Sequence, residues 1–88
     1  MSVGMNVTIF VPDLPDFMPV IEGVKGQAGV QLLPPKAGYW QVQAPQRISF
    51  TRKGLGLRVA LWYSMLAGGF CGKLREYTRD QLVIEAEQ

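Results

Sequence analysis

The chain has 88 residues, of which 48% are apolar and 18% are charged, and its formal net charge is +2. This composition is typical of a folded globular domain and excludes a disordered or collagen-like chain. A chain this short buries only about 60 to 65% of the surface that its unfolded form exposes, so we expect one core and one domain over residues 1–88. Because charges are few, we also expect part of the surface to contact another protein or a second copy of the chain.

Side chains that carry chemistry are scarce. The chain has no histidine and one cysteine, Cys71. This excludes an intramolecular disulfide and a zinc site, and it removes the usual general base. We therefore expect no metal and no cofactor, and we interpret Cys71, between Phe70 and Gly72, as a small buried hydrophobic residue. The single cysteine and the lack of a leader pattern after Met1 favour a reducing, cytoplasmic location.

The N-terminal third begins with a strand pattern. Val7, Ile9 and Val11 alternate with polar residues, which predicts a half-buried strand over residues 5–11. Residues 12–19 contain three prolines and two aspartates, and this predicts an ordered loop because proline breaks ladders and helix interiors. Glycine then recurs at every third position, at Gly23, Gly26 and Gly29. This spacing predicts turns around short extended segments.

Three further strands are predicted in the middle of the chain. The first covers residues 27–33 and is closed by Pro34 and Pro35. The second covers 39–44, where Trp40, Val42 and Ala44 alternate with tyrosine and glutamine. The third covers 46–52, with Ile48 and Phe50 on one side.

Residues 57–68 predict a helix that ends at Gly68-Gly69, since the run is rich in leucine, alanine and methionine. Its apolar residues surround the whole helix, so we expect it to be buried on more than one side. A continuous buried strand is the alternative, because Val59, Trp62 and Tyr63 favour strands. The run is too short to span a membrane.

The last residues predict a β-hairpin, with strands at 73–77 and 81–86 joined by a polar loop. The order of elements then favours an α+β fold with a small antiparallel or mixed β-sheet, one buried helix at about 57–68 and a C-terminal hairpin. An all-β, barrel-like fold is the alternative.

Positive charge is concentrated in residues 47–75, which contain no acidic residue. Such a segment can attract phosphate groups, and it can equally pair with the acidic residues before and after it. Its basic residues are Arg47, Arg52, Lys53, Arg58, Lys73 and Arg75.

Within that segment, one turn combines glycines with basic side chains and predicts an anion-binding site. The candidate residues are Arg52, Lys53, Gly54, Gly56 and Arg58. The dinucleotide-binding pattern fails here, because Val59 occupies the position of its third glycine. A tight turn that needs two glycines for backbone freedom explains the same residues without a ligand.

Small residues recur four apart at Ala60, Ser64 and Gly68. On a helix they would form a row that another backbone can approach closely, either within the monomer or at a dimer interface. The sequence as a whole therefore predicts a small non-enzymatic binding module with a protein partner, most simply a second copy in a homodimer. The alternative is an anion or nucleic-acid binder that uses residues 47–75.

Overall fold

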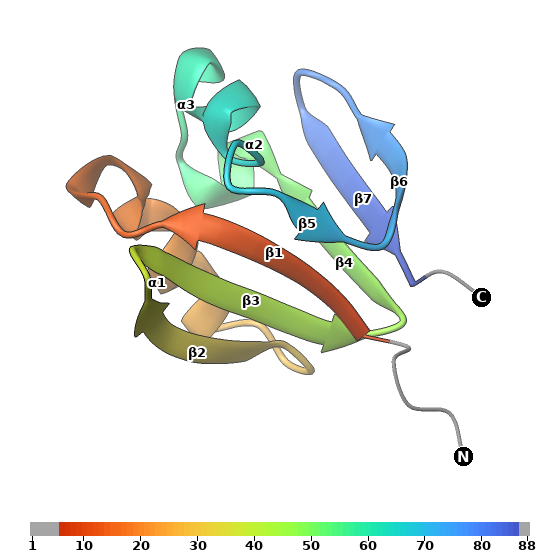
Figure 1. Cartoon of the computed structure of the whole chain (residues 1–88). Helices are drawn as coiled ribbons and strands as arrows, with labels where there is room; N and C mark the ends of the chain where they lie inside the picture. Colours follow the sequence, from red (N-terminus) through yellow and green to blue (C-terminus); the bar gives the residue numbers. More distant parts are fainter. Residues whose placement is uncertain (1–5, 87–88) are drawn as a thin grey trace.

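The computed structural model describes residues 6–86 of the chain. Its first sheet has four antiparallel strands. Its strands are β1 (Asn6–Pro12), β2 (Gln31–Lys36), β3 (Tyr39–Pro45) and β5 (Phe70–Cys71). They occur in the order β2-β3-β1-β5 (Figure 1). The strands predicted at 5–11 and 39–44 are confirmed as β1 and β3, although residue 5 lies outside the described residues. Val7, Ile9 and Val11 are fully buried, as the alternation predicts.

The second sheet has three antiparallel strands, β4 (Arg47–Thr51), β6 (Lys73–Tyr77) and β7 (Gln81–Glu85). Their order is β4-β7-β6, so the predicted hairpin and the strand predicted at 46–52 are confirmed. One buried cluster joins side chains of both sheets. The prediction of a single sheet is wrong, and so is the barrel-like alternative, because the strands form two separate sheets.

The chain passes between the two sheets at residues with positive φ. Gln46 (φ 72) connects β3 to β4, and Gly72 (φ 136) connects β5 to β6. A Cβ atom on Gly72 would lie 2.8 Å from Ile84 Cγ2 and 2.9 Å from the Glu85 carbonyl oxygen. The absence of a side chain at Gly72 therefore lets the two sheets approach each other at this end.

The loop predicted over residues 12–19 is wrong, because helical structure begins inside it. A short 3-10 helix, η1 (Pro15–Phe17), leads into α1 (Met18–Lys25). Pro15 and Pro19 occupy the first turns of these helices, where the missing N–H group would have no intrahelical partner. The apolar side chains of α1 that are buried in the core are Val20, Ile21 and Val24.

Gly23 lies inside α1 rather than in the predicted turn. A Cβ atom on Gly23 would lie 2.6 Å from Leu55 Cδ2, so the lack of a side chain at Gly23 leaves room for the Leu55 side chain of α2. Gly26 caps α1, and Gly29 (φ 80) occupies a turn as predicted.

Two prolines lie inside β2 rather than after it. The strand predicted at 27–33 is shifted and includes Pro34 and Pro35. Because β2 is an edge strand, its outer side needs no ladder hydrogen bonds and can accommodate proline.

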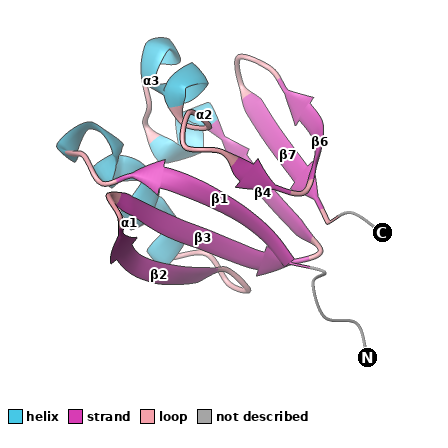
Figure 2. Ribbon diagram, viewed as in Figure 1, coloured by secondary structure: helices cyan, strands magenta, loops and turns pink. Residues whose placement is uncertain are grey.

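The helix predicted at 57–68 is confirmed in type but not in extent. Two short helices, α2 (Arg52–Leu55) and α3 (Val59–Ser64), take the place of one long helix (Figure 2). The strand alternative is excluded. The expectation of burial on more than one side is also wrong, because Trp62 is fully buried while Tyr63 is 49% exposed. Within residues 6–86, no helix has the length and apolar character needed to cross a bilayer.

We predict that Gly72→Ala lowers the free energy of unfolding by about 3 kcal/mol, since the new methyl group meets close neighbours and the backbone has positive φ. Gly29→Ala is the matched control. Its φ is also positive, but a Cβ atom there meets nothing within 4 Å, so we expect a loss of about 1 kcal/mol. Urea unfolding of both variants measures the difference, and equal losses would contradict the steric role of Gly72.

Candidate functional site

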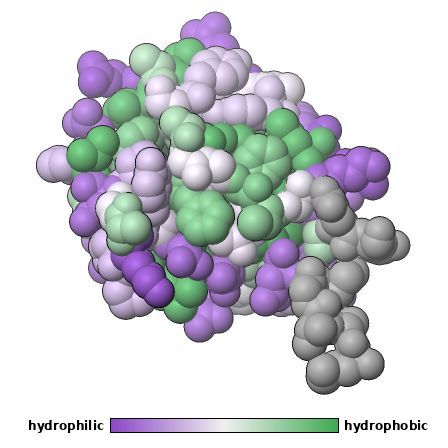
Figure 3. Space-filling model, viewed as in Figure 1, coloured by the Kyte–Doolittle hydropathy of each residue, from purple (hydrophilic) through white to green (hydrophobic). Residues whose placement is uncertain are grey.

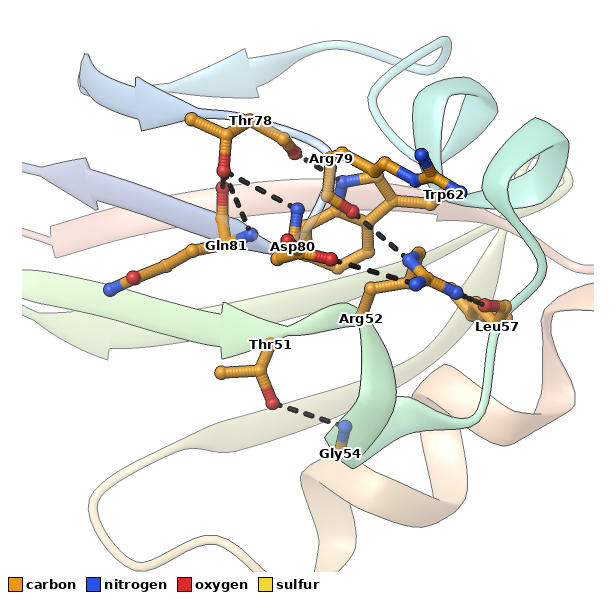
Figure 4. A network of polar contacts seen from close by, with 9 residues as sticks. All are labelled: Thr51, Arg52, Gly54, Leu57, Trp62, Thr78, Arg79, Asp80 and Gln81. Atoms are coloured by element: carbon orange, nitrogen blue, oxygen red, sulfur yellow. Dashed lines mark hydrogen bonds and ion pairs between the residues drawn. The ribbon is translucent and has the colours of Figure 1, made fainter.

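The tip of the β6–β7 hairpin is bound to α2 by the guanidinium group of Arg52 (Figure 4). Its Nε donates to the Arg79 carbonyl oxygen at 3.0 Å, and its Nη1 donates to the Leu57 carbonyl oxygen at 3.2 Å. Its Nη2 lies 3.5 Å from Asp80 Oδ1. The Arg52 side chain is only 18% exposed. These contacts make it a structural group that joins the hairpin tip to the segment between α2 and α3.

The two glycines of the predicted anion site serve the backbone of α2. The Gly54 amide donates to Thr51 Oγ1 at 3.0 Å, and a Cβ atom on Gly54 would lie 2.6 Å from that oxygen. Gly56 (φ 68) is the C-cap of α2 in the left-handed conformation. The tight-turn interpretation accounts for both glycines. Of the five candidate residues, this leaves Lys53 and Arg58 with exposed basic side chains.

Two aromatic residues form a second connection between α3 and the hairpin. Trp62 Nε1 donates to the Thr78 carbonyl oxygen at 2.7 Å, and the Tyr77 hydroxyl donates to the Trp62 carbonyl oxygen at 2.6 Å. The two rings are 6.0 Å apart, and the Tyr63 ring lies 5.5 Å from that of Tyr77. Burial, and to a smaller extent the neighbouring Tyr63, raise the pKa of Tyr77 above 10.0.

The six basic residues of the segment 47–75 divide into two groups at opposite ends of the second sheet. At one end, Arg47 and Lys73 flank Glu85 in the strand register, and Arg75 Nε donates to Glu85 Oε1 at 2.6 Å. Glu85 thus lies beside this half of the basic segment. The other half comprises Arg52, Lys53 and Arg58.

The predicted row of small residues is not continuous. Ala60 and Ser64 lie on α3 and are exposed, but the helix ends before Gly68. A Cβ atom on Gly68 would lie 2.6 Å from both the Phe10 carbonyl oxygen and Tyr39 Cε1. Gly68 therefore packs within the monomer, and its small size serves a contact with β1 and β3.

Sequence reasoning did not identify the outer face of the first sheet, on the side away from α1. We call this surface the open face; no helix covers it in Figure 1. Hydrophobic side chains gather near the centre of the same view, over β1 and β5 (Figure 3). The strand register assigns to the open face Asn6, Thr8, Phe10, Pro12, Gln31, Leu33, Tyr39, Gln41, Gln43, Pro45 and Cys71.

The open face lacks charged residues across its centre. One register row crosses all four strands as Gln31, Gln43, Thr8 and Cys71. Within the described residues, Lys36 is the one charged residue that shares the register of this face, and it stands at the corner where β2 turns into β3. The sequence already indicated this lack of charge. The polar positions of the strands predicted at 5–11 and 39–44 carry residues such as threonine and glutamine instead of charged residues.

A shallow hollow of about 210 Å³ lies at another corner of the open face. Its walls come from the first three strands and the segment before β2, and they contain no charged side chain. They are formed by Asn6, Gly29, Val30, Gln31, Gln43, Ala44 and Pro45.

Cys71 is exposed, so the prediction of a buried cysteine is wrong. Its position opposite Thr8 in the short strand β5 directs it to the open face and not to the core.

In the described part of the chain, no group of three acidic or cysteine side chains could hold a metal ion. Comparison with known proteins found no family model that matches the chain and no matching curated protein.

We predict that Arg52→Gln lowers the free energy of unfolding by about 2 kcal/mol, because the carbonyl oxygens of Arg79 in the hairpin tip and of Leu57 after α2 lose a charged donor. Arg58→Gln is the control with the same change of side chain, and its exposed position predicts a change within about 0.5 kcal/mol. Urea denaturation of the two variants tests this. Equal stability of the two proteins would remove the structural role of Arg52.

A second prediction concerns alkaline pH. Because the pKa of Tyr77 is raised in the folded state, the unfolded state loses this proton first. The stability associated with Tyr77 is therefore fully present below about pH 10 and is lost as the pH rises through its folded pKa. Tyr77→Phe should lose less stability than the natural protein between about pH 8 and 11, and an equal loss in the two proteins would contradict this role of Tyr77. Unfolding curves across this range give the measurement.

Proposed function

We propose that this domain is a binding module that self-associates through the open face. The observation that carries the proposal is the lack of charge on an uncovered sheet face in a protein whose net charge is +2. Exposed faces of small domains usually carry charged residues, which keep the protein soluble and monomeric. A face without them can be brought against another surface without desolvating an ion.

The chemistry of the open face favours a second copy as the partner. Gln31, Gln41 and Gln43 each carry a donor and an acceptor on the same side chain, so an amide row can pair with an identical row. A two-fold interface places the same surface on both partners, and a charged surface would then repel itself. The apolar members, such as Phe10 and Leu33, add area that gains from removal of water.

The sheet edges are less suitable for association than the face. Pro34 and Pro35 interrupt the outer edge of β2. The outer strand β6 has a register shift between Leu74 and Glu76, as in a β-bulge, and it carries charged side chains. Both features oppose the addition of a further strand. Association face to face is thus the mode that the surface supports best.

The extent of the open face sets an expectation for affinity. A standard stable interface uses roughly 20 to 30 residues on each side, and the open face has fewer. We therefore expect a reversible dimer with a dissociation constant of about a micromolar or weaker.

Gln43→Lys tests the proposal, because it puts one positive charge on the open face of each copy. We predict that the variant dimerises at least about tenfold more weakly, as like charges meet across the interface. The matched control is Gln81→Lys, because the Gln81 side chain extends away from Arg52 and its partners in the hairpin tip (Figure 4). Sedimentation or light scattering between about 1 µM and 1 mM protein measures both variants.

Alkylation of Cys71 provides an independent readout, since the thiol lies on the open face. Its rate should fall as the concentration of the natural protein rises, and it should stay constant for Gln43→Lys. A natural protein that remains monomeric at about 1 mM would overturn the proposal.

A further inference from the structure

A group of basic side chains gathers at the hairpin-tip end of the second sheet. We call Lys53, Arg58 and Arg79 the basic pole. Arg52 brings them together, because its guanidinium contacts the backbone of Arg79 and of Leu57, the residue before Arg58. Lys53 follows Arg52 directly, and the Gly56 amide donates to its carbonyl oxygen at 3.1 Å. Figure 4 shows the Arg79 side chain extending from the hairpin tip toward α3.

The charge of the basic pole is not compensated in the described structure. Within residues 6–86, the ion pairs are Lys25 with Glu22, Arg52 with Asp80 and Arg75 with Glu85. None of them includes a member of the basic pole. Asp80, which follows Arg79 in the chain, is already paired with Arg52. Three exposed positive side chains therefore remain available at one end of the molecule.

An exposed aromatic ring lies on α3, the helix whose N-cap is Arg58 of the basic pole. Tyr63 is 49% exposed, and its ring packs against that of Tyr77, which precedes Arg79 by two residues. Tyr77 is in turn fixed to α3 through its hydrogen bond to the Trp62 carbonyl oxygen. Tyr63 thus presents a supported ring surface on the helix that begins at Arg58 and against the strand that leads to Arg79. Stacking platforms next to basic side chains are the combination by which proteins bind single-stranded nucleic acids without sequence preference.

We infer that the basic pole binds the phosphodiester backbone of single-stranded nucleic acid, with Tyr63 as the stacking surface for a base. The α2 N-terminus plays no part, because Thr51 Oγ1 already accepts the hydrogen bond of the Gly54 amide. Arg52 is a positioning residue, since its donors hold the two segments that carry Arg58 and Arg79. This site is separate from the open face and does not depend on self-association.

The test is fluorescence anisotropy with a labelled oligothymidylate of about ten nucleotides at about 20 mM salt. The triple variant Lys53→Gln, Arg58→Gln, Arg79→Gln should bind at least about tenfold more weakly than the natural protein. The matched control removes the same total charge at the other end of the sheet, with Arg47→Gln, Lys73→Gln and Arg75→Gln. We expect it to change the affinity by less than about threefold.

Two further measurements make the result specific. The logarithm of the binding constant should fall with the logarithm of salt concentration with a slope of about −2, as expected for three phosphate contacts on a single strand. Tyr63→Ala should weaken binding by at least about fivefold, while Tyr63→Phe, which keeps the ring, should leave it unchanged. Circular dichroism confirms that each variant is folded.

Three outcomes would overturn the inference: no binding at low salt, an equal loss in the two triple variants, or binding of inorganic tripolyphosphate without binding of the oligonucleotide. Dilution experiments on the same triple variant keep this inference distinct from the proposed function. The open face is intact in that variant, so its self-association should be unchanged.

Discussion

The arrangement of this domain depends on how the β6–β7 hairpin tip is held. At one end of the molecule the two sheets are connected by short crossings at Gln46 and Gly72. At the other end the connection runs through α2 and α3, which have four and six residues and are too short to be stable alone. Arg52 and Trp62 bond the carbonyl oxygens of the hairpin tip to these helices. The same contacts fix the positions of Arg58, Arg79 and Tyr63.

Elements with strict alternation could be predicted from the sequence, and those interrupted by proline could not. β3 and β4 bury alternate residues, and β1 buries Val7, Ile9 and Val11, so these strands follow the two-residue period, which depends only on which side of a strand is buried. Pro19 was predicted to lie in a loop and Pro34 to end a strand, but Pro19 lies in the first turn of α1 and Pro34 lies inside β2. Proline is compatible with the first turn of a helix and with an edge strand, and both conditions depend on neighbours that a local pattern does not reveal.

The candidate site shows the same limit. Gly54 and Gly56 could be identified as a turn because their role is local. The role of Arg52 could not, since its partners Arg79 and Asp80 are distant in the sequence and meet it only when the hairpin folds back. Gly23 is a similar case, because the Leu55 side chain that packs beside it comes from a helix distant in the sequence. The open face was visible in part, as the polar positions of β1 and β3 carry no charge.

The basic side chains lie at two ends of the second sheet, whereas the centre of the open face is neutral. The two kinds of surface therefore respond differently to dissolved salt. Contacts of a basic pole with phosphates are screened by dissolved ions, whereas amide and apolar contacts on a neutral sheet are nearly indifferent to them. Ionic strength could therefore release one type of partner and leave the other in place. A domain of 88 residues would in this way hold two attachments whose lifetimes respond differently to the same change in the surrounding solution.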